Sequence, residues 1–170
     1  LGVIAALERR GAEVVLNTGR PVDGAIDAVV VGLHRDFDYD RLSVAASAAR
    51  KCGRLIGTNT DPTLPTPEGP QPGGGALLAA IATASGVEPV IGGKPYPPMA
   101  ELVTSIVAAT QLQVAPERMV MVGDRIDTDG RFAARLGCRF ALVRSGVPAE
   151  QNLSEQGVLV DLEVDDLAAV

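Results

Sequence analysis

The chain has 170 residues, of which 46% are hydrophobic but only 3% aromatic, and its formal net charge is −6. This length can bury the core of one domain or of two small ones. The acidic charge, the lack of a basic stripe and the scarcity of aromatic side chains argue against nucleic acid and against an anionic membrane as partners. No run approaches the roughly 18 apolar residues of a membrane span, so we predict a cytoplasmic protein. Cys52 and Cys138 lie far apart and form no zinc spacing, which favours two buried thiols in a reducing compartment.

Apolar periodicity and glycine breaks predict alternating helices and strands in the first part of the chain. In chain order we expect the end of an amphipathic helix at 1–10, a short strand at 12–16, a buried strand at 28–32, a helix at 40–52 and a strand at 54–58. Their short connections imply parallel pairing with right-handed crossovers.

A long loop follows from Asn59 to Gly75, with prolines at positions 62, 65, 67, 70 and 72. A loop of this length inside a compact domain is usually functional or a linker. Because prolines stiffen the backbone, we interpret it as a fixed active-site loop rather than a flexible tether.

The second part of the chain alternates in the same way. We expect a helix at 76–85, a strand at 87–91, a helix at 97–112, a strand at 119–122, a helix at about 128–136, a strand at 138–143 and a strand followed by a short helix within 156–169.

Acidic residues gather at the end of the strand at 119–122. This strand runs into Gly123-Asp124, and Asp127 and Asp129 follow at once. Ligands of open α/β sheets bind at the carboxyl ends of parallel strands, and clustered carboxylates suit Mg²⁺. Asp124 and Asp129 can converge only if the chain turns from strand into helix between them, which Gly123 permits. The alternative is an acid-rich helix start, which Asp127 fits well.

Lys94 lies in Gly92-Gly-Lys-Pro95, directly after the strand at 87–91. Glycines let backbone amides approach an anion, and a lysine supplies a point charge for phosphate. The alternative is a surface lysine in a turn. Its pairing with Asp124 favours phosphoryl transfer, which needs a cation for the phosphate and a carboxylate for Mg²⁺.

Other polar and glycine positions carry weaker signals. Asn59 and Asp61 open the proline-rich loop and could contact substrate, although an Asx turn explains them nearly as well. Gly73–Gly75 could bind an anion at a helix start, but a flexible turn is the better interpretation. His34 is the only histidine, so no Ser-His-Asp or Cys-His arrangement can be argued, and we expect a surface or turn role for it.

An ordered set of motifs resembles a known family. The motifs are Val29–Leu33 with Phe37 and Tyr39, Gly57–Asp61, the loop Pro65-Thr66…Gly69…Pro72-Gly73, Gly93–Pro95, Gly123–Arg125 with Thr128 and Asp129, and Ser145–Val147. Over nearly the whole chain and in the right order, they resemble the haloacid dehalogenase-like (HAD) phosphatases, and more narrowly subfamily IIA, which includes NagD-type and nitrophenyl phosphate phosphatases.

The resemblance implies an α/β fold with parallel sheets, in which an α/β cap domain is inserted into a Rossmann-like HAD core. Residues 1–88 would be most of the cap, and residues 89–170 would be the carboxyl-terminal half of the core. Caps of this kind also imply a homodimer formed through the cap.

The resemblance also implies roles for single residues. Lys94 would be the catalytic residue that holds the phosphate, and Asp124 would bind Mg²⁺. Asp129, the other catalytic residue, would be the supporting carboxylate near the metal and the lysine. The cap segment over the substrate would supply the substrate-binding residues Asn59, Asp61, Leu64 and Pro65.

The chain departs from the family in one respect. The family's nucleophile is an Asp in a DxD motif, with a Ser/Thr motif after the next strand, and neither occurs upstream of the cap segment here. Aspartyl-phosphate chemistry needs that carboxylate. We therefore expect a Mg²⁺-dependent phosphatase of small phosphorylated metabolites, represented by a chain that is inactive alone. The alternative is a non-enzymatic or degenerate α/β domain that binds a ligand or a partner.

Overall fold

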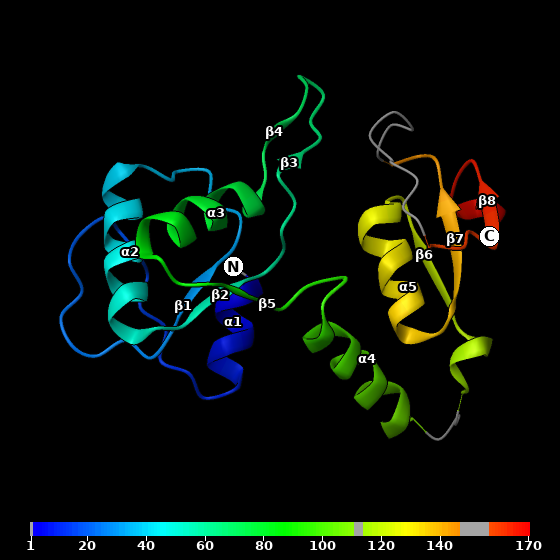
Figure 1. Cartoon of the computed structure of the whole chain (residues 1–170), viewed down its shortest axis with the longest axis horizontal. Helices are drawn as coiled ribbons and strands as arrows, with labels where there is room; N and C mark the ends of the chain where they lie inside the picture. The colour runs from blue at the N-terminus through cyan, green and yellow to red at the C-terminus, as the bar shows by residue number, and fades with distance from the viewer. Residues whose placement is uncertain (1, 111–113, 147–156) are drawn as a thin grey trace. The chain divides into compact units, whose positions relative to one another are not determined.

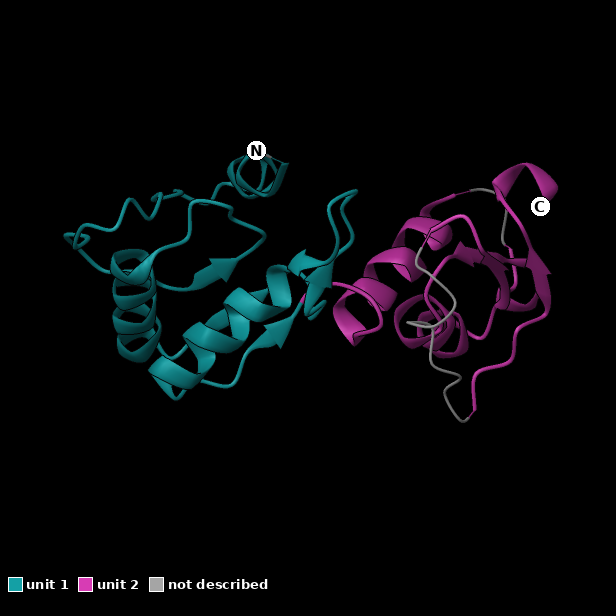
Figure 2. Ribbon diagram, turned by 90° about the horizontal axis from the view of Figure 1, so that it is seen from above, with its two compact units in different colours: residues 1–91 teal, residues 92–170 magenta. Residues whose placement is uncertain are grey.

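The computed structural model describes residues 2–110, 114–146 and 157–170 (Figure 1). The chain divides into two compact units, residues 1–91 and 92–170, which Figure 2 shows in teal and magenta. Each unit carries its own parallel sheet. In the described part of the chain, no helix combines the length and the apolar character that crossing a membrane requires.

The first unit is built on a parallel sheet in the order β1-β2-β5. Its elements are α1 (Gly2–Arg9), β1 (Val29–Val31), α2 (Tyr39–Cys52), β2 (Leu55–Gly57), β3 (Thr63–Leu64), β4 (Gln71–Pro72), α3 (Gly74–Ser85) and β5 (Val90–Ile91). The valines of β1 are β-branched, which favours a strand. The side chain of Asp38 caps the start of α2, and Gly53 ends this helix in the left-handed conformation.

The core of this unit lies between its sheet and helices α2 and α3. A Cβ atom at Gly57 would lie 2.2 Å from Leu78 Cδ2, so glycine at the end of β2 leaves the space that Leu78 of α3 fills. Leu55 is only 1% exposed, and burying a side chain of this size contributes roughly 1.5–3 kcal/mol. The buried side chains of this core are Val31, Ala45, Ala46, Ala49, Leu55, Leu78, Ile81 and Ile91.

Two sequence-based predictions for this unit need correction. Residues 12–16 form no strand, and Val15 and Leu16 lie exposed because the sheet ends at β1. The proline-rich loop is not structureless, since β3 and β4 pair as an antiparallel hairpin. Thr66 and Gly69 close its turn through reciprocal backbone hydrogen bonds of 3.2 and 2.9 Å.

The second unit holds a parallel sheet in the order β6-β7-β8. Its elements are α4 (Pro97–Ala109), the 3-10 helix η1 (Pro116–Arg118), β6 (Val120–Gly123), the π-helical turn η2 (Ile126–Gly130), α5 (Arg131–Leu136), β7 (Arg139–Val143), β8 (Leu162–Val164) and the 3-10 helix η4 (Leu167–Ala169). Ala133, Phe140 and Leu142 form its core, against which Met121, Ile126, Cys138, Val158 and Val160 pack.

Most predicted elements of the second part have their counterpart in the structure, and parallel pairing is confirmed in both units. The helix expected at 97–112 ends at Ala109, and the end of that prediction, like Gln156, lies outside the described residues. The helix expected at 128–136 begins instead with the π-helical turn. The first compact unit ends at Ile91, where β5 pairs with β2 at Gly57↔Ile91, while the division into a cap at 1–88 and a half-core at 89–170 stays a prediction.

Leu55→Ala should lower the free energy of unfolding of the first unit by about 2–5 kcal/mol, because it removes buried methyl groups and leaves a cavity. Urea unfolding followed by circular dichroism measures this loss. The matched control is Leu16→Ala, at a side chain that is 60% exposed, which should change stability by no more than about 0.5 kcal/mol. An equal loss in both variants would show that residues 12–16 pack in solution as a buried strand.

Candidate active site

Lys94 and Asp129, which are 35 residues apart in sequence, meet in the second unit. Lys94 Nζ lies 2.6 Å from Asp129 Oδ1. The Asp129 side chain is 5% exposed, whereas the Lys94 side chain is 42% exposed. The lysine therefore contacts a buried carboxylate while part of its side chain stays open to a ligand.

The π-helical turn η2 brings the Asp129 side chain back to the backbone at the end of β6. The amide of Asp129 donates to Arg125 O at 2.8 Å, and the amide of Gly130 donates to the same oxygen at 3.2 Å. The second carboxylate oxygen of Asp129, Oδ2, accepts hydrogen bonds from the amides of Asp124 and Arg125, each at 3.2 Å. A buried carboxylate is stable only when it is paired and hydrogen-bonded, and the lysine and these amides meet that requirement.

Gly123, the last residue of β6, makes room for this carboxylate. A Cβ atom at position 123 would lie 2.2 Å from Asp129 Oδ2, far inside van der Waals contact. The sequence predicts that Gly123 permits the turn from strand into helix. The structure adds a second reason for glycine, which is the close approach of the Asp129 side chain.

Asp124 and Asp127 have different surroundings. Asp124 follows β6 directly, and its amide joins it to Asp129. Asp127 forms a bidentate ion pair with Arg125, with Nε–Oδ1 3.1 Å and Nη2–Oδ2 2.9 Å. Bidentate pairs of arginine with carboxylate are strong and directional. Asp127 therefore does more than begin a helix, since it holds the arginine that follows Asp124.

The sequence reasoning missed the part played by arginines. Arg125 carries a weak signal, because it stands between acids in Asp124-Arg-Ile-Asp127. Arg135 of α5 donates from Nε to Pro95 O at 2.7 Å, which ties α5 to the turn that carries Lys94. No local pattern indicates this second contact, since 40 residues separate the partners.

Asp124 is the side chain on which a fit to Mg²⁺ depends. In the residues that the structure describes, no three or more His, Cys, Asp or Glu side chains gather as a metal site. Mg²⁺ is usually bound by one or two carboxylates and keeps several waters or phosphate oxygens. The carboxylate of Asp124 suits one such position, so the residues present fit a cation that draws its other ligands from elsewhere.

The predicted substrate-binding residues Asn59, Asp61, Leu64 and Pro65 lie together in the first unit, between β2 and α3. Asn59 Oδ1 is buried and has no hydrogen-bond partner among the described residues. A Cβ atom at Gly74 would lie 2.8 Å from this oxygen, so Asn59 packs against the start of α3. Whether these residues contact a substrate stays a prediction.

The glycines at 73–75 have a packing role in the same region. Cβ atoms at Gly73 and Gly75 would lie 2.4 Å from Asp61 O and 2.3 Å from Thr60 O. Side chains here would collide with the backbone of the proline-rich loop. The close contact explains these glycines without an anion. His34 is exposed, as expected for a surface or turn residue.

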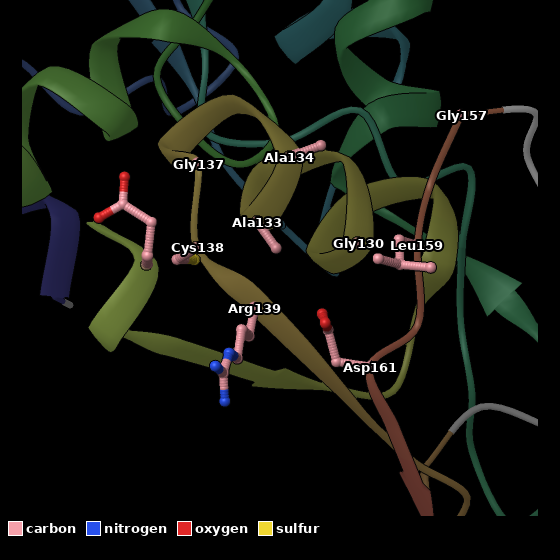
Figure 3. A pocket seen from close by; sticks show the side chains of 10 residues that line it. Gly130, Ala133, Ala134, Gly137, Cys138, Arg139, Gly157, Leu159 and Asp161 are labelled. Atoms are coloured by element: carbon pink, nitrogen blue, oxygen red, sulfur yellow. The ribbon is translucent and has the colours of Figure 1, made fainter. Parts of the chain in front are cut away.

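A pocket of about 270 Å³ lies elsewhere in the second unit (Figure 3). Gly130, Ala133, Cys138 and Asp161 are among the residues around it, but Lys94, Asp124 and Asp129 are not. Burial raises the pKa of the Cys138 thiol, which disfavours the reactive thiolate. The charged cluster around Asp129 is therefore the better candidate for chemistry.

Known proteins that are similar to this chain are HAD-like hydrolases and phosphatases. The HAD-hydrolase-like family model matches residues 91–170. The chain is 39% identical over 142 residues to D-glycerol 3-phosphate phosphatase from Mycobacterium tuberculosis, covering 84% of this chain and 38% of that protein. The structure of 4-nitrophenylphosphatase from Thermotoga maritima matches with a TM-score of 0.77 and 30% identity, over 97% of this chain and 59% of that one. These matches support the resemblance to subfamily IIA of the HAD-like hydrolases.

The HAD relatives add two facts that bear on the site. A crystal structure of a glycerol phosphate phosphatase from Mycobacterium tuberculosis in complex with calcium matches with a TM-score of 0.60 and 40% identity, over 71% of this chain and 34% of that one. HAD phosphatases are generally metal-dependent. This chain spans about half the length, or less, of the curated relatives it matches.

The ion pair between Lys94 and Asp129 should couple the two side chains by about 1–2 kcal/mol, between the values typical of exposed and of buried pairs. A double-mutant cycle of Lys94→Met and Asp129→Asn, measured by urea unfolding, gives this coupling energy. Asn keeps an oxygen for the amides of Asp124 and Arg125, so the cycle isolates the charge pair. Additive losses in the double variant would show that the pair does not form in solution.

Proposed function

We propose that this chain supplies the phosphate-holding and metal-binding half of a Mg²⁺-dependent phosphatase of small phosphorylated metabolites. One observation carries the proposal, namely that Lys94 and the amide of Asp124 bind the two oxygens of one buried carboxylate, Asp129. A cation for the phosphate and a carboxylate for the metal are the groups that phosphoryl transfer needs. The relatives named above are phosphatases, which supports the same reaction class.

Each side chain has a distinct task in this proposal. Lys94 Nζ holds the charge of the phosphate, and Asp129 orients Lys94 through the 2.6 Å contact. Asp124 holds Mg²⁺, which when bound neutralises charge on the phosphate oxygens. Arg125 holds Asp127 in a bidentate pair.

The remaining groups of the proposed active site, the nucleophile and the substrate-binding residues, are expected outside these residues or in the first unit. We propose that an attacking aspartate, in a DxD motif outside this chain, forms the aspartyl-phosphate. The first unit would act as the cap, with Asn59, Asp61, Leu64 and Pro65 over the leaving group. A homodimer through this unit and a cytoplasmic location complete the proposal.

Substrates of the relatives suggest the class of molecule. The relatives include D-glycerol 3-phosphate phosphatase, acid sugar phosphatase and 4-nitrophenylphosphatase. Each of these names indicates a phosphate ester with a small leaving group. We propose that this chain serves a phosphate ester of the same size.

The 170-residue chain alone should not turn over 4-nitrophenyl phosphate in the presence of Mg²⁺, because no attacking carboxylate of the family pattern is present. Release of 4-nitrophenolate, followed by absorbance, measures this activity. Mg²⁺-dependent turnover by the pure chain that disappears in Asp124→Asn would contradict the proposed inactivity and would locate a nucleophile within these residues.

A chimera tests the proposed reaction directly. Fusing the part of the Thermotoga maritima 4-nitrophenylphosphatase that precedes the matched region to the amino end of this chain should yield Mg²⁺-dependent turnover. Lys94→Met and Asp124→Asn in the chimera should each lower kcat/KM by about 10²–10³, the range found for loss of one electrostatic stabiliser. Ser105→Ala, an exposed change on α4, should leave kcat/KM unchanged.

The chimera also distinguishes the alternative function. A folded chimera without turnover, together with binding of inorganic phosphate by the chain that Lys94→Met abolishes, would favour a ligand-binding domain that has no catalytic role. Turnover that is insensitive to Lys94→Met and Asp124→Asn would reject the assignment of these residues.

A further inference from the structure

The Asp124 side chain lies against Gly146, a residue that has no side chain. A Cβ atom at Gly146 would lie 2.0 Å from Asp124 Oδ2 and 2.5 Å from both Cβ and Cγ of Asp124. Carbon atoms that are not bonded approach only to about 3.5–4.0 Å. Any side chain at position 146 must therefore displace either the Asp124 carboxylate or the backbone that carries it.

The sheet explains why these two residues meet. β6 and β7 pair in parallel, with Gly123 beside Leu142, so both strands end at the same edge. Asp124 follows the end of β6, and Gly146 follows β7 within a short turn. The register of the two strands thus brings the Gly146 backbone against the Asp124 side chain.

Backbone conformation does not account for this glycine. Gly146 is not among the glycines of the described residues with positive φ, so its backbone is one that other residues can adopt. The residue is also exposed, so core packing does not demand a small side chain there. The close approach of Asp124 is the reason that the structure offers for glycine at this position.

We propose that Gly146 is a positioning residue for Asp124. The absence of a side chain at position 146 lets the Asp124 carboxylate take the orientation in which it would hold the cation, and an added methyl group removes that orientation. The cation part of this inference rests on the proposed function. The orientation itself does not, because it follows from the steric contact.

Nuclear magnetic resonance of the 170-residue chain tests the inference without turnover. Three-bond couplings report the χ1 rotamer of Asp124 in the wild type, in Gly146→Ala and in Gly32→Ala. Gly32 is the matched control, since it also follows a strand, but a Cβ atom there would lie 3.6 Å from Thr58 Oγ1, an ordinary contact. We expect a changed rotamer in Gly146→Ala and an unchanged one in Gly32→Ala, with well-dispersed amide spectra for both.

Titration with Mn²⁺, a paramagnetic stand-in for Mg²⁺, provides a second readout. Signals from the Asp124 and Arg125 amides should broaden in the wild type, and Gly146→Ala should need at least about tenfold more Mn²⁺, equivalent to 1.4 kcal/mol or more. Gly32→Ala should behave like the wild type.

The two readouts separate the two possible failures. Unchanged Asp124 couplings in Gly146→Ala would overturn the positioning role, and so would a changed rotamer with an unchanged Mn²⁺ requirement. A wild-type chain whose Asp124 and Arg125 signals ignore Mn²⁺ would count against the proposed metal site, while the couplings would still decide whether Gly146 orients Asp124.

Discussion

The buried carboxylate of Asp129 is the constraint on which the rest of the second unit's site depends. An isolated charge in such a place is costly, so the fold must bring donors to both of its oxygens. Lys94 reaches one oxygen from the turn after β5, and the amides of Asp124 and Arg125 reach the other from the end of β6. Satisfying one carboxylate therefore brings the Lys94 ammonium and the backbone amide of a second aspartate, Asp124, to the same side chain.

This arrangement requires a π-helical turn after β6 and a glycine at position 123. A π-helical turn rather than an α-helical one carries the chain from Arg125 to Asp129, and such turns are frequent at functional sites. Gly123 leaves the space into which Asp129 folds back. Arg125 binds the neighbouring acid, Asp127, through two hydrogen bonds. The site is thus held by backbone geometry as much as by charge.

Sequence patterns predicted the elements with long or strongly β-branched runs, including β1, α2, α3 and β7. They failed where pairing decides structure, since residues 12–16 have strand-like composition but no partner strand in the described sheet. The hairpin of β3 and β4 was missed because prolines disfavour strands, although Pro72 tolerates an edge position. Short apolar runs carry little information unless the neighbouring strand is known.

The sequence by itself determined the α/β class, the family and the chemical types at the site, because Lys94, Asp124 and Asp129 stand in ordered motifs after strands. Only the tertiary structure decided which groups meet. It paired Lys94 with Asp129 and Asp127 with Arg125. It also brought Arg135 into a hydrogen bond with the carbonyl oxygen of Pro95. The close contacts in the structure show why positions 123 and 146 carry glycine. These contacts depend on strand register, which arises from pairing between residues distant in sequence, and on a π-helical turn that local backbone hydrogen bonds close.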